Sequence, residues 1–454
     1  MEAAKNAAAV SAALNAVREN GEIITRVGRG TPMGEAMRRF WLPALLSTEV
    51  LRDGPPLRLR ILGEDLVAFR DTDGQVGIID AFCPHKRAPL FFGRNEKCGL
   101  RCVYHGWKFD VHGQCLDIPN IIPPDNYDTL VRRMRITAYE TAEAGGVVWA
   151  YMGPAEKKPA LPRMEWMGLP ADHVHVSRWL QRSNWLQGME GELDTAHISF
   201  LHVSGSMGDT LSRGATLAQD GAPVIFIKDT DYGFFYAARR RFENQFYWRI
   251  SHWLLPMWSA VPPTPDFYFG HGRGWSPVDD YMTTTFAYRY RVDGPLDDQD
   301  MKEINEGVSF PPLMKRTSVE MPNGHLIDTY VPIANKANDY MIDRDLQRTS
   351  SFTGIFGINA QDRGLQESMP GMPGDRPGIV DRTGEHLVAS DMPVSTARRK
   401  LVRMALDVQK GVEPVAARSP DSYQVRALAK LSPIADFDEF LQTIELDLKA
   451  TYLG

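Results

Sequence analysis

Two sulfur and two nitrogen ligands recur at a short, regular spacing in the first part of the chain. Cys83 and His85 form the pattern C-x-H, and after sixteen intervening residues Cys102 and His105 form C-x-x-H. In a Rieske [2Fe-2S] cluster two Cys bind one iron and two His bind the other, which raises the reduction potential above that of an all-Cys cluster. The four residues therefore predict a one-electron relay of this type.

A structural zinc ion is the alternative occupant of these four side chains. Zinc fingers usually take both Cys from one knuckle and both His from a helix, whereas each loop here supplies one Cys and one His. This order favours the iron-sulfur cluster over a zinc-stabilised interaction protein. The two hypotheses predict different colours for the purified protein, because a Rieske centre is red-brown and a zinc site is colourless.

A second set of ligand types lies in the segment from Asn184 to His202. Asp194 precedes His197 by three residues, and His202 follows His197 by five. On an ideal helix over 190–202 the rings of His197 and His202 would be partly rotated from each other, and a bent helix end would bring them together. Two His and one carboxylate form the ligand set of non-haem Fe(II) oxygenases, which leaves positions open for dioxygen. The sequence thus predicts an iron site at these two His.

The third ligand of this set has to come from elsewhere in the chain. The segment 361–367, with the sequence QDRGLQE, follows the glycine-containing stretch 354–357. It offers the carboxylate of Asp362, which we take as the third ligand.

With these motifs the chain resembles the oxygenase component of the Rieske non-haem iron aromatic-ring oxygenases, especially the phthalate-dioxygenase-like branch. The resemblance covers most of the chain, and the segments that carry it are 31–35, 38–43, the two cluster loops, 184–202 and 361–367. It implies an α+β protein with an N-terminal all-β Rieske domain. A helix-grip type catalytic domain follows, in which an antiparallel sheet surrounds a helix.

The resemblance also implies a role for each ligand-type residue. The cluster is bound by Cys83, His85, Cys102 and His105, and the mononuclear iron by His197, His202 and Asp362. Asp194 corresponds to a bridging aspartate, which contacts His197 on one side and His105 of the partner subunit on the other. A carboxylate in this place fixes the orientation and tautomer of the imidazole. We therefore expect a closed homotrimer, or stacked trimers, in which each cluster serves the next subunit's iron.

One cluster loop departs from the family pattern. Many relatives have Arg-Gly after the first cluster His, where this chain has Lys86 and Arg87. A residue with a side chain thus stands at a position that favours a positive φ, which glycine adopts at little cost. We expect the geometry of this loop to be affected and no ligand to be lost.

Composition and charge exclude several classes of protein. The chain has 454 residues, of which 43% are hydrophobic and 24% charged, as in ordinary soluble proteins. A net charge of −6 gives no general attraction to nucleic acid or to acidic membranes. No run of eighteen apolar residues is present, so a membrane span is excluded on length.

Two further cysteines, Cys98 and Cys115, are not needed by the cluster. We interpret them as reduced thiols in a cytoplasmic protein. A disulfide between them is the alternative.

The electron source is expected to be a separate protein. The glycine-rich segment 28–34 lacks the dinucleotide fingerprint, because Met33 stands where its third glycine would be. It better predicts a turn that opens a helix at Pro32, since proline suits the first helical position. With no visible nicotinamide or flavin site, the chain would receive electrons from an NAD(P)H-dependent reductase.

Patterning divides the chain into three parts. Residues 1–40 are expected to form an N-terminal helical extension, 41–155 the Rieske domain and 156–454 the catalytic domain, with a proline-rich linker at 154–162. Alternation of apolar and polar residues predicts strands at 57–62, 66–70, 76–80, 133–140, 145–151, 233–242, 246–255 and 281–291. A helix is predicted over 395–409.

Few residues outside the ligand motifs suggest contacts with a substrate. Arg249 could pair with a substrate carboxylate through both arms of its guanidinium, or form an ordinary ion pair. Trp253, Met257 and Trp258 are candidates for a pocket wall, although aromatic stripes more often belong to the core. The other His are interpreted as structural or surface residues: His112, His173, His175, His252, His271, His325 and His386.

The sequence thus predicts a terminal oxygenase for a small aromatic acid. Positioning of the substrate next to the iron would choose among dihydroxylation, monohydroxylation and O-demethylation. Ring hydroxylation of an aromatic carboxylate, phthalate-like or a substituted benzoate, is the first hypothesis and demethylation of a methoxy-aromatic acid the second. A non-catalytic Rieske electron carrier with a binding domain is the alternative of another class, but a carrier has no need of the motif from Asp194 to His202.

Overall fold

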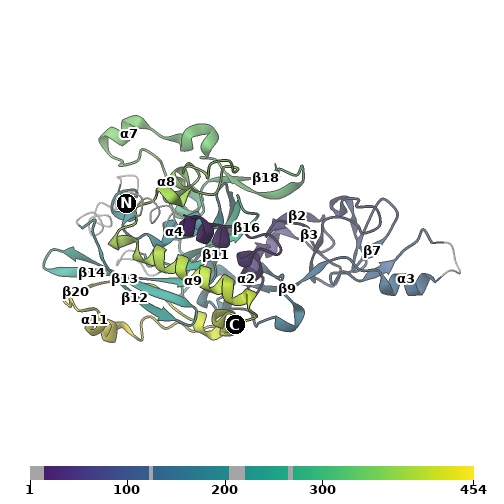
Figure 1. Cartoon of the computed structure of the whole chain (residues 1–454), viewed down its shortest axis with the longest axis horizontal. Helices are drawn as coiled ribbons and strands as arrows, with labels where there is room; N and C mark the ends of the chain where they lie inside the picture. Colours follow the sequence, from purple (N-terminus) through teal and green to yellow (C-terminus); the bar gives the residue numbers. More distant parts are fainter. Residues whose placement is uncertain (1–14, 122–125, 204–219, 264–268, 454) are drawn as a thin grey trace, which may run out of the picture.

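The computed structural model describes residues 15–121, 126–203, 220–263 and 269–453. An all-β part projects from a larger body in which helices and a hairpin surround a long sheet (Figure 1). No helix in these ranges is long and apolar enough to cross a membrane.

The projecting part is built on a six-stranded antiparallel sheet in the order β1-β10-β9-β4-β3-β2. Its strands are β1 Trp41–Leu46, β2 Leu57–Ile61, β3 Glu64–Arg70, β4 Val76–Asp80, β9 Ala138–Ala144 and β10 Val147–Tyr151. In β2 the three apolar residues are buried and the two arginines between them are partly exposed, which confirms the strand predicted from alternation.

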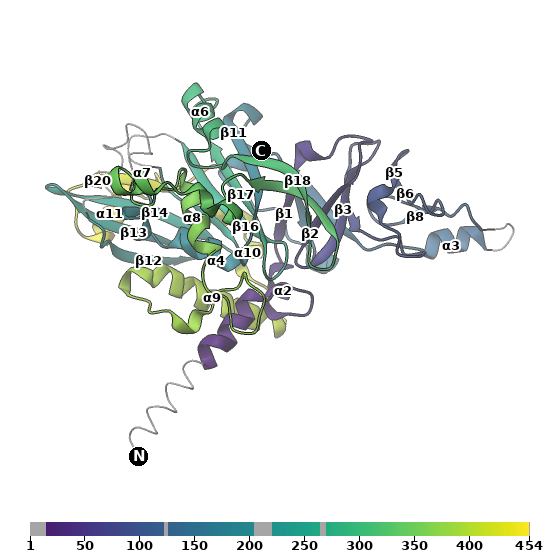
Figure 2. The same cartoon turned by 90° about the horizontal axis from the view of Figure 1, so that it is seen from above.

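A second, four-stranded sheet carries the cluster loops at the far end of this part. It consists of β5 Arg94–Asn95, β6 Leu100–Arg101, β7 Lys108–Phe109 and β8 Cys115–Asp117, next to helix α3 Tyr127–Arg133. It has its own small hydrophobic core, which includes Cys83, Cys102 and Cys115. Figure 2 shows β5, β6, β8 and α3 at the tip, away from the large sheet. All four cysteines are free.

The large body contains an eight-stranded antiparallel sheet in the order β11-β17-β16-β15-β14-β13-β12, with β20 paired to β14. Its strands are β11 Val174–Gln181, β12 Val224–Thr230, β13 Gly233–Phe242, β14 Gln245–Leu254, β15 Trp258–Ala260, β16 Gly270–Pro277, β17 Thr283–Tyr290 and β20 Leu428–Ser432. The predicted strands at 233–242, 246–255 and 281–291 are therefore confirmed to within about two residues at either end.

One helix lies inside the curve of this sheet. Every residue of α4 Trp185–Leu193 except Gly191 is buried. The helix packs against β15 and β16 and against two further helices, α8 Ile358–Gln366 and α9 Met392–Gln409. Its N-terminus is capped by Asn184, whose side chain accepts a hydrogen bond from the amide of Leu186 at 3.1 Å. A sheet that surrounds a helix, as predicted, is thus the frame of the catalytic part.

A β-hairpin spans the two parts. It consists of β18 Met314–Glu320 and β19 Leu326–Pro332, and β19 lies along β2 of the small part and β11 of the large one. Asp328 in β19 forms an ion pair with Arg58 at 2.7 Å. Nearby, Arg178 and Glu49 form a buried ion pair at 2.5 Å between the two parts. Further α-helices in the described residues are α2 Pro32–Met37, α6 Asp298–Glu306, α7 Arg344–Thr349, α10 Val415–Arg418 and α11 Phe437–Ile444.

The predicted helix start at Pro32 is confirmed. Thr31 caps α2 with its hydroxyl, and Pro32 occupies the first turn. The helix predicted over 395–409 is confirmed as α9, which begins three residues earlier at Met392. The expected domain boundary near 155 lies between β10 and β11.

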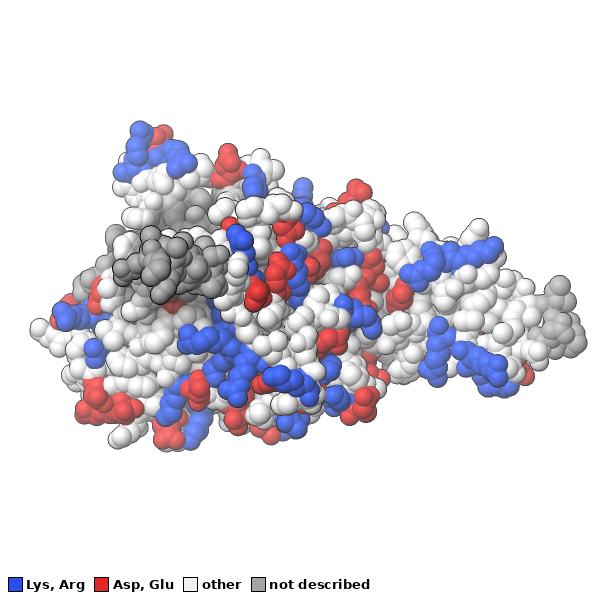
Figure 3. Space-filling model, in the orientation of Figure 1, with Lys and Arg blue, Asp and Glu red and all other residues white. Residues whose placement is uncertain are grey.

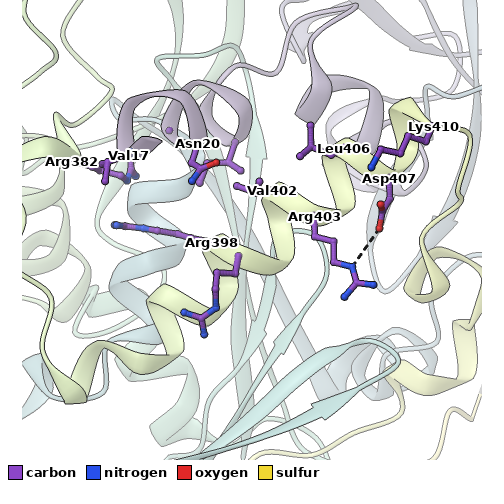
Figure 4. A pocket seen from close by; sticks show the side chains of 12 residues that line it. Val17, Asn20, Arg382, Arg398, Val402, Arg403, Leu406, Asp407 and Lys410 are labelled. Atoms are coloured by element: carbon purple, nitrogen blue, oxygen red, sulfur yellow. Dashed lines mark ion pairs between the residues drawn. The ribbon is translucent and has the colours of Figure 1, made fainter. Parts of the chain in front are cut away.

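The N-terminal segment is helical over 15–25 and packs across α9, while residues 1–14 of the predicted extension lie outside the described residues. A cavity of about 450 Å³ lies in this seam. Figure 4 shows Val17, Val402 and Leu406 among its walls. Three of its arginines already have acidic partners: Arg382 with Glu190, Arg398 with Glu190 and Glu385, and Arg403 with Asp407. We therefore interpret this cavity as a packing seam between helices.

Candidate metal centres

The two cluster loops have the same backbone design. In the first, the amide of Arg87 donates to the carbonyl of Cys83 at 2.8 Å, and the amide of Cys83 donates to the carbonyl of Ala88 at 2.9 Å. In the second, the amide of Gly106 donates to the carbonyl of Cys102 at 2.9 Å, and the amide of Cys102 donates to the carbonyl of Trp107 at 2.8 Å. Each loop is thereby closed on its Cys, and the His two or three residues later is held at the rim.

The fifth position of each loop has a positive φ. Gly106 has φ +79°, and a Cβ at that position would lie 2.5 Å from Cγ of Pro119. Arg87, at the equivalent position of the first loop, has φ +56°. The expectation that a non-glycine residue stands at a glycine-favouring position is confirmed. No ligand-type residue is displaced by it.

The four predicted cluster residues come together at the tip. The rings of His85 and His105 are 4.5 Å apart between centroids, and His85 stacks on Trp107 at 4.7 Å. Both Cys are buried, whereas both His are partly exposed. Burial, followed by the proximity of Cys102, raises the pKa of Cys83 to about 11. Two sulfurs inside and two imidazoles outside fit a cluster that receives electrons at the surface.

The second site depends on where α4 ends. The helix ends at Leu193 and does not continue over 190–202, and a short 3-10 turn, His197–Ser199, follows. The carboxylate of Asp194 accepts hydrogen bonds from the amides of Ala196 at 2.9 Å and His197 at 3.3 Å, which is the reason that the chain turns here. The break gives the bend needed to bring His197 and His202 together.

Three side chains then converge. The Nε2 atoms of His197 and His202 are 3.0 Å apart, and Oδ1 of Asp362 lies 3.6 Å from the first and 3.2 Å from the second. Asp362 is carried by α8, which packs against α4. The structure therefore brings together the three residues predicted as iron ligands, from segments about 160 residues apart.

The geometry of both imidazoles suits a bound cation. Nδ1 of His197 donates to the main-chain carbonyl of Asp194, and Nδ1 of His202 donates to Oε1 of Gln361 at 2.7 Å. In the neutral form of each ring Nε2 is then the unprotonated nitrogen, and it faces the other ring and the carboxylate of Asp362. Two such nitrogens beside a carboxylate fit a metal ion.

The pKa values follow from this convergence. Burial and then the nearby His202 lower the pKa of His197. Burial opposes the charging of His202 as well, but the carboxylate of Asp362 outweighs it and raises the pKa of His202. Burial alone would raise the pKa of Asp362, whereas the two His and Arg273 hold it well below its usual range. The site thus keeps a negative charge beside two nitrogen ligands.

Asp194, the predicted bridge, lies at the edge of this site. Its Oδ2 is 3.9 Å from Nδ1 of His197, while the direct hydrogen bond to that ring comes from its main-chain carbonyl. The side chain is 32% exposed. It is therefore able to meet another molecule.

A cavity of about 200 Å³ adjoins His197 and His202. Its described walls come from α4, the 3-10 turn, β13, β14, β16, α6 with the segment 308–310 after it, and the first residue of α8. The polar residues among them include Glu192, Arg249, Ser251, His271, Arg273 and Glu303. Arg249 donates to the carbonyl of Pro262 at 2.9 Å, and among the described residues no carboxylate pairs with it.

The aromatic candidates lie elsewhere. Trp253 and Met257 are fully buried in the main core, and the indole of Trp253 points its N–H at Met189. Trp258 packs at 5.4 Å on Trp149 between the two parts of the chain. None of these three residues is among the described walls of the cavity.

Sequence reasoning missed three residues beside the site: His271, Arg273 and Glu192. His271 and Arg273 are two apart on β16 and so face the same side, as Arg249 and Ser251 do on β14. Polar residues at every second position of buried strands were the signal that could have identified them.

Comparisons with known proteins identify the family. Residues 40–130 match the Rieske [2Fe-2S] domain, and residues 150–434 match the LigXa C-terminal domain like family, which is more than half of the chain. The chain therefore belongs to the oxygenase components of the Rieske non-haem iron oxygenases, whose catalytic domain uses a mononuclear non-haem iron. The donor sets described above fit both groups.

Relatives place it in the phthalate-dioxygenase-like branch. The chain is 38% identical to the oxygenase subunit of 3-chlorobenzoate-3,4-dioxygenase from Comamonas testosteroni, over 90% of this chain and 93% of that one. It is 36% identical to the oxygenase subunit of phthalate 4,5-dioxygenase from Pseudomonas putida, over 87% of each. The predicted family, enzyme class and cofactors are confirmed.

Solved structures share the fold. Dicamba monooxygenase bound to dicamba aligns with a TM-score of 0.55 at 17% identity, covering 83% of this chain and 99% of that chain. NdmA of Pseudomonas putida CBB5 aligns with a TM-score of 0.54 at 19% identity, covering 86% of this chain and 96% of that chain. The predicted fold class, an all-β Rieske domain before a catalytic domain with an antiparallel sheet, is confirmed.

Proposed function

We propose that this chain is the terminal oxygenase for a small aromatic carboxylate, with His197, His202 and Asp362 as iron ligands. The observation that carries the proposal is a guanidinium, that of Arg249, in the wall of the cavity beside those ligands. It is held by main-chain carbonyls, at 2.9 Å to Pro262, and its Nε makes no hydrogen bond. A partly buried cation of this kind, whose Nε is shielded from water, favours an anionic ligand.

The neighbouring groups support an anion at Arg249. His271 has a buried Nε2 without a hydrogen-bond partner, and burial, followed by Arg289 and Arg249, lowers its pKa to about 3. It is therefore a neutral group able to hydrogen-bond a carboxylate. Arg273, the other Arg among the described walls, is engaged by Asp362 and Glu192. Among the described residues, the positive charge left for a substrate is thus that of Arg249.

The size of the cavity favours a single ring. At about 200 Å³ it is smaller than the pockets of drug-sized ligands. The relatives named above act, by their names, on chlorobenzoate and phthalate. When bound, the iron would supply dioxygen activation, and the residues of this chain would orient the ring and exclude water.

The choice between hydroxylation and demethylation depends on which substrate atom lies next to the iron. The 5,5'-dehydrodivanillate O-demethylase oxygenase subunit of a Sphingobium strain is 29% identical over 88% of this chain. Demethylation of a methoxy-aromatic acid would use the same anion contact at Arg249. Product analysis with phthalate, 3-chlorobenzoate and 4-methoxybenzoate separates the two reactions.

Replacement of Arg249 by Met tests the carboxylate contact. We expect about 10- to 100-fold weaker binding of the best aromatic acid, since a hydrogen bond to a charged group contributes about 1.5–3 kcal/mol. Binding of the matching neutral amide should change little. Calorimetry with each acid and its amide measures this difference in affinity. An equal loss of affinity for the acid and for the amide would contradict the proposal. Arg182, which is exposed at the end of β11, offers a matched Arg182→Met control.

Oxygenase subunits of this family work with separate reductase or ferredoxin components. We propose an NAD(P)H-dependent reductase as donor and a head-to-tail homotrimer as the assembly. Exposed apolar residues support the second proposal, because they flank both metal centres: Val103 and Tyr104 beside the cluster, and Phe200 and Phe352 beside Asp194, all at least half exposed. In such a ring Asp194 would meet His105 of the partner subunit. Light scattering measures the assembly, and a fully active monomer would contradict it.

A further inference from the structure

Three charged side chains form a buried row behind the proposed iron ligands. Nη1 of Arg273 donates to Oδ2 of Asp362 at 3.2 Å, and Nη2 donates to Oε2 of Glu192. The side chains are 10%, 4% and 3% exposed in the order Arg273, Asp362, Glu192. The contact between the guanidinium and the two carboxylates is therefore shielded from water, where such contacts are strong.

The guanidinium has a fixed place. Ser259 donates its hydroxyl to the other oxygen of Glu192 at 3.1 Å, which holds that carboxylate on the wall of the sheet. The ring of Phe310 covers Arg273 with 4.0 Å between the guanidinium carbon and the ring centroid. Arg273 and Ser259 come from β16 and β15, two neighbouring strands. The sheet, and not a loop, thus positions the cation.

The two oxygens of Asp362 consequently face different groups. Oδ1 faces the Nε2 atoms of His197 and His202, at 3.6 and 3.2 Å, whereas Oδ2 faces Arg273. A carboxylate can bind a metal through one oxygen or through both. With a guanidinium on Oδ2, the second oxygen is occupied.

We propose that Arg273, held by Glu192, restricts Asp362 to binding the metal through Oδ1 alone. This inference rests on the proposed iron site. Its consequence is that a coordination position which Oδ2 would otherwise take stays open toward the cavity. Glu192 balances the charge of Arg273, so the restriction adds no net positive charge next to the metal. Both are positioning residues, because they act through Asp362.

The test uses the full-length protein with Co(II) in the mononuclear site and the cluster oxidised. The double variant Arg273→Met with Glu192→Gln removes the cation and its counter-charge together, so that no buried charge is left unpaired. Infrared difference spectra with isotope-labelled Asp measure the separation of the two carboxylate stretching bands, which is wide for one-oxygen binding and narrow for two. We expect the wide separation in the wild type and a narrow one in the double variant.

Two controls separate this effect from a general loss of structure. Arg178→Met with Glu49→Gln removes another buried ion pair, at 2.5 Å, away from the cavity, and should keep the wide separation. Glu192→Gln alone leaves Arg273 on Asp362 and should also keep it. A narrow separation in the Arg178→Met with Glu49→Gln variant would overturn the assignment to Arg273, because that pair does not touch Asp362.

The outcomes distinguish the inference about Arg273 from the proposed metal site on which it rests. Co(II) bound with a wide separation in the double variant would overturn the role of Arg273 and leave the metal site intact. Failure of Co(II) to bind the wild type, or equal binding to Asp362→Ala, would overturn the metal site itself. Occupancy is measured by the electron paramagnetic resonance of high-spin Co(II).

Discussion

The two metal centres of this chain are built in opposite ways. The cluster site uses two short loops, each of which supplies a Cys and a His and closes on its own backbone. The mononuclear site uses the end of one helix, a 3-10 turn and a second helix far along the chain. The first site stands at a tip with its His partly exposed, whereas the second lies within the body with its carboxylate buried. A relay needs access for a partner, and a reaction site needs exclusion of water.

The strongest test of this comparison removes one site at a time. His197→Ala or Asp362→Ala should abolish product formation and leave the visible spectrum of the cluster unchanged, because no cluster residue contacts the mononuclear ligands in the described structure. Cys102→Ser should instead bleach the cluster. Absorption spectra, metal analysis and product formation report on both sites, and turnover by His197→Ala would show that the site has been misassigned.

The link between the sites is the next target. Asp194→Asn keeps the turn that orders the segment, since an amide oxygen can still accept from Ala196 and His197. We expect the single-turnover rate to fall about 10- to 100-fold, the usual effect of losing a partner of a metal ligand. The iron content has to be shown equal to that of the wild type. Cluster oxidation and product formation at the wild-type rate would remove Asp194 from the electron route.

Buried histidines make the catalytic part more sensitive to acid than the cluster tip. His252 lies between the hydroxyl of Tyr232 at 2.7 Å and the carbonyl of Arg426 at 3.1 Å, and burial lowers its pKa to about 4. Because its folded pKa lies below the unfolded value of about 6.5, the unfolded chain binds more protons between these values. Stability from this residue is therefore present above pH 6.5 and lost as the pH falls toward 4.

From pH 7 to pH 5 this loss should amount to about 2 kcal/mol in the free energy of unfolding. Urea unfolding followed by near-ultraviolet circular dichroism measures it at each pH. His252→Gln does not titrate, so the stability difference between wild type and variant should shrink by that amount at pH 5. Parallel pH profiles would show that His252 titrates normally in the folded protein.

The smallest effect concerns the loop that departs from the family pattern. Arg87→Gly relieves a positive φ that costs an ordinary residue about 1–2 kcal/mol, and glycine loses about 0.5–1 kcal/mol in entropy. We expect a net stabilisation of about 0.5 kcal/mol with an unchanged cluster spectrum. Gly106→Ala in the sister loop is the matched comparison. It should destabilise the protein, because its Cβ would meet Pro119.

Much of this molecule was determined by the sequence itself. Ligand types at short spacing predict the cluster loops because each loop is local, and the hydrogen bonds that close it span only four or five residues. Alternation predicted β2 because only one face of this strand is buried. Even the positive φ of Arg87 could be predicted, since it follows from the position within a loop.

Other features were decided only by the tertiary structure. The pairing of His202 with Gln361 and Asp362 depends on helix packing across about 160 residues. The sequence around Trp258 and the sequence around Arg249 gave no means of deciding which of the two side chains lines a cavity. The packing of the two domains buried Trp258 in the core and left Arg249 in the wall of the cavity. Burial depends on which surfaces meet and not on the residue type alone.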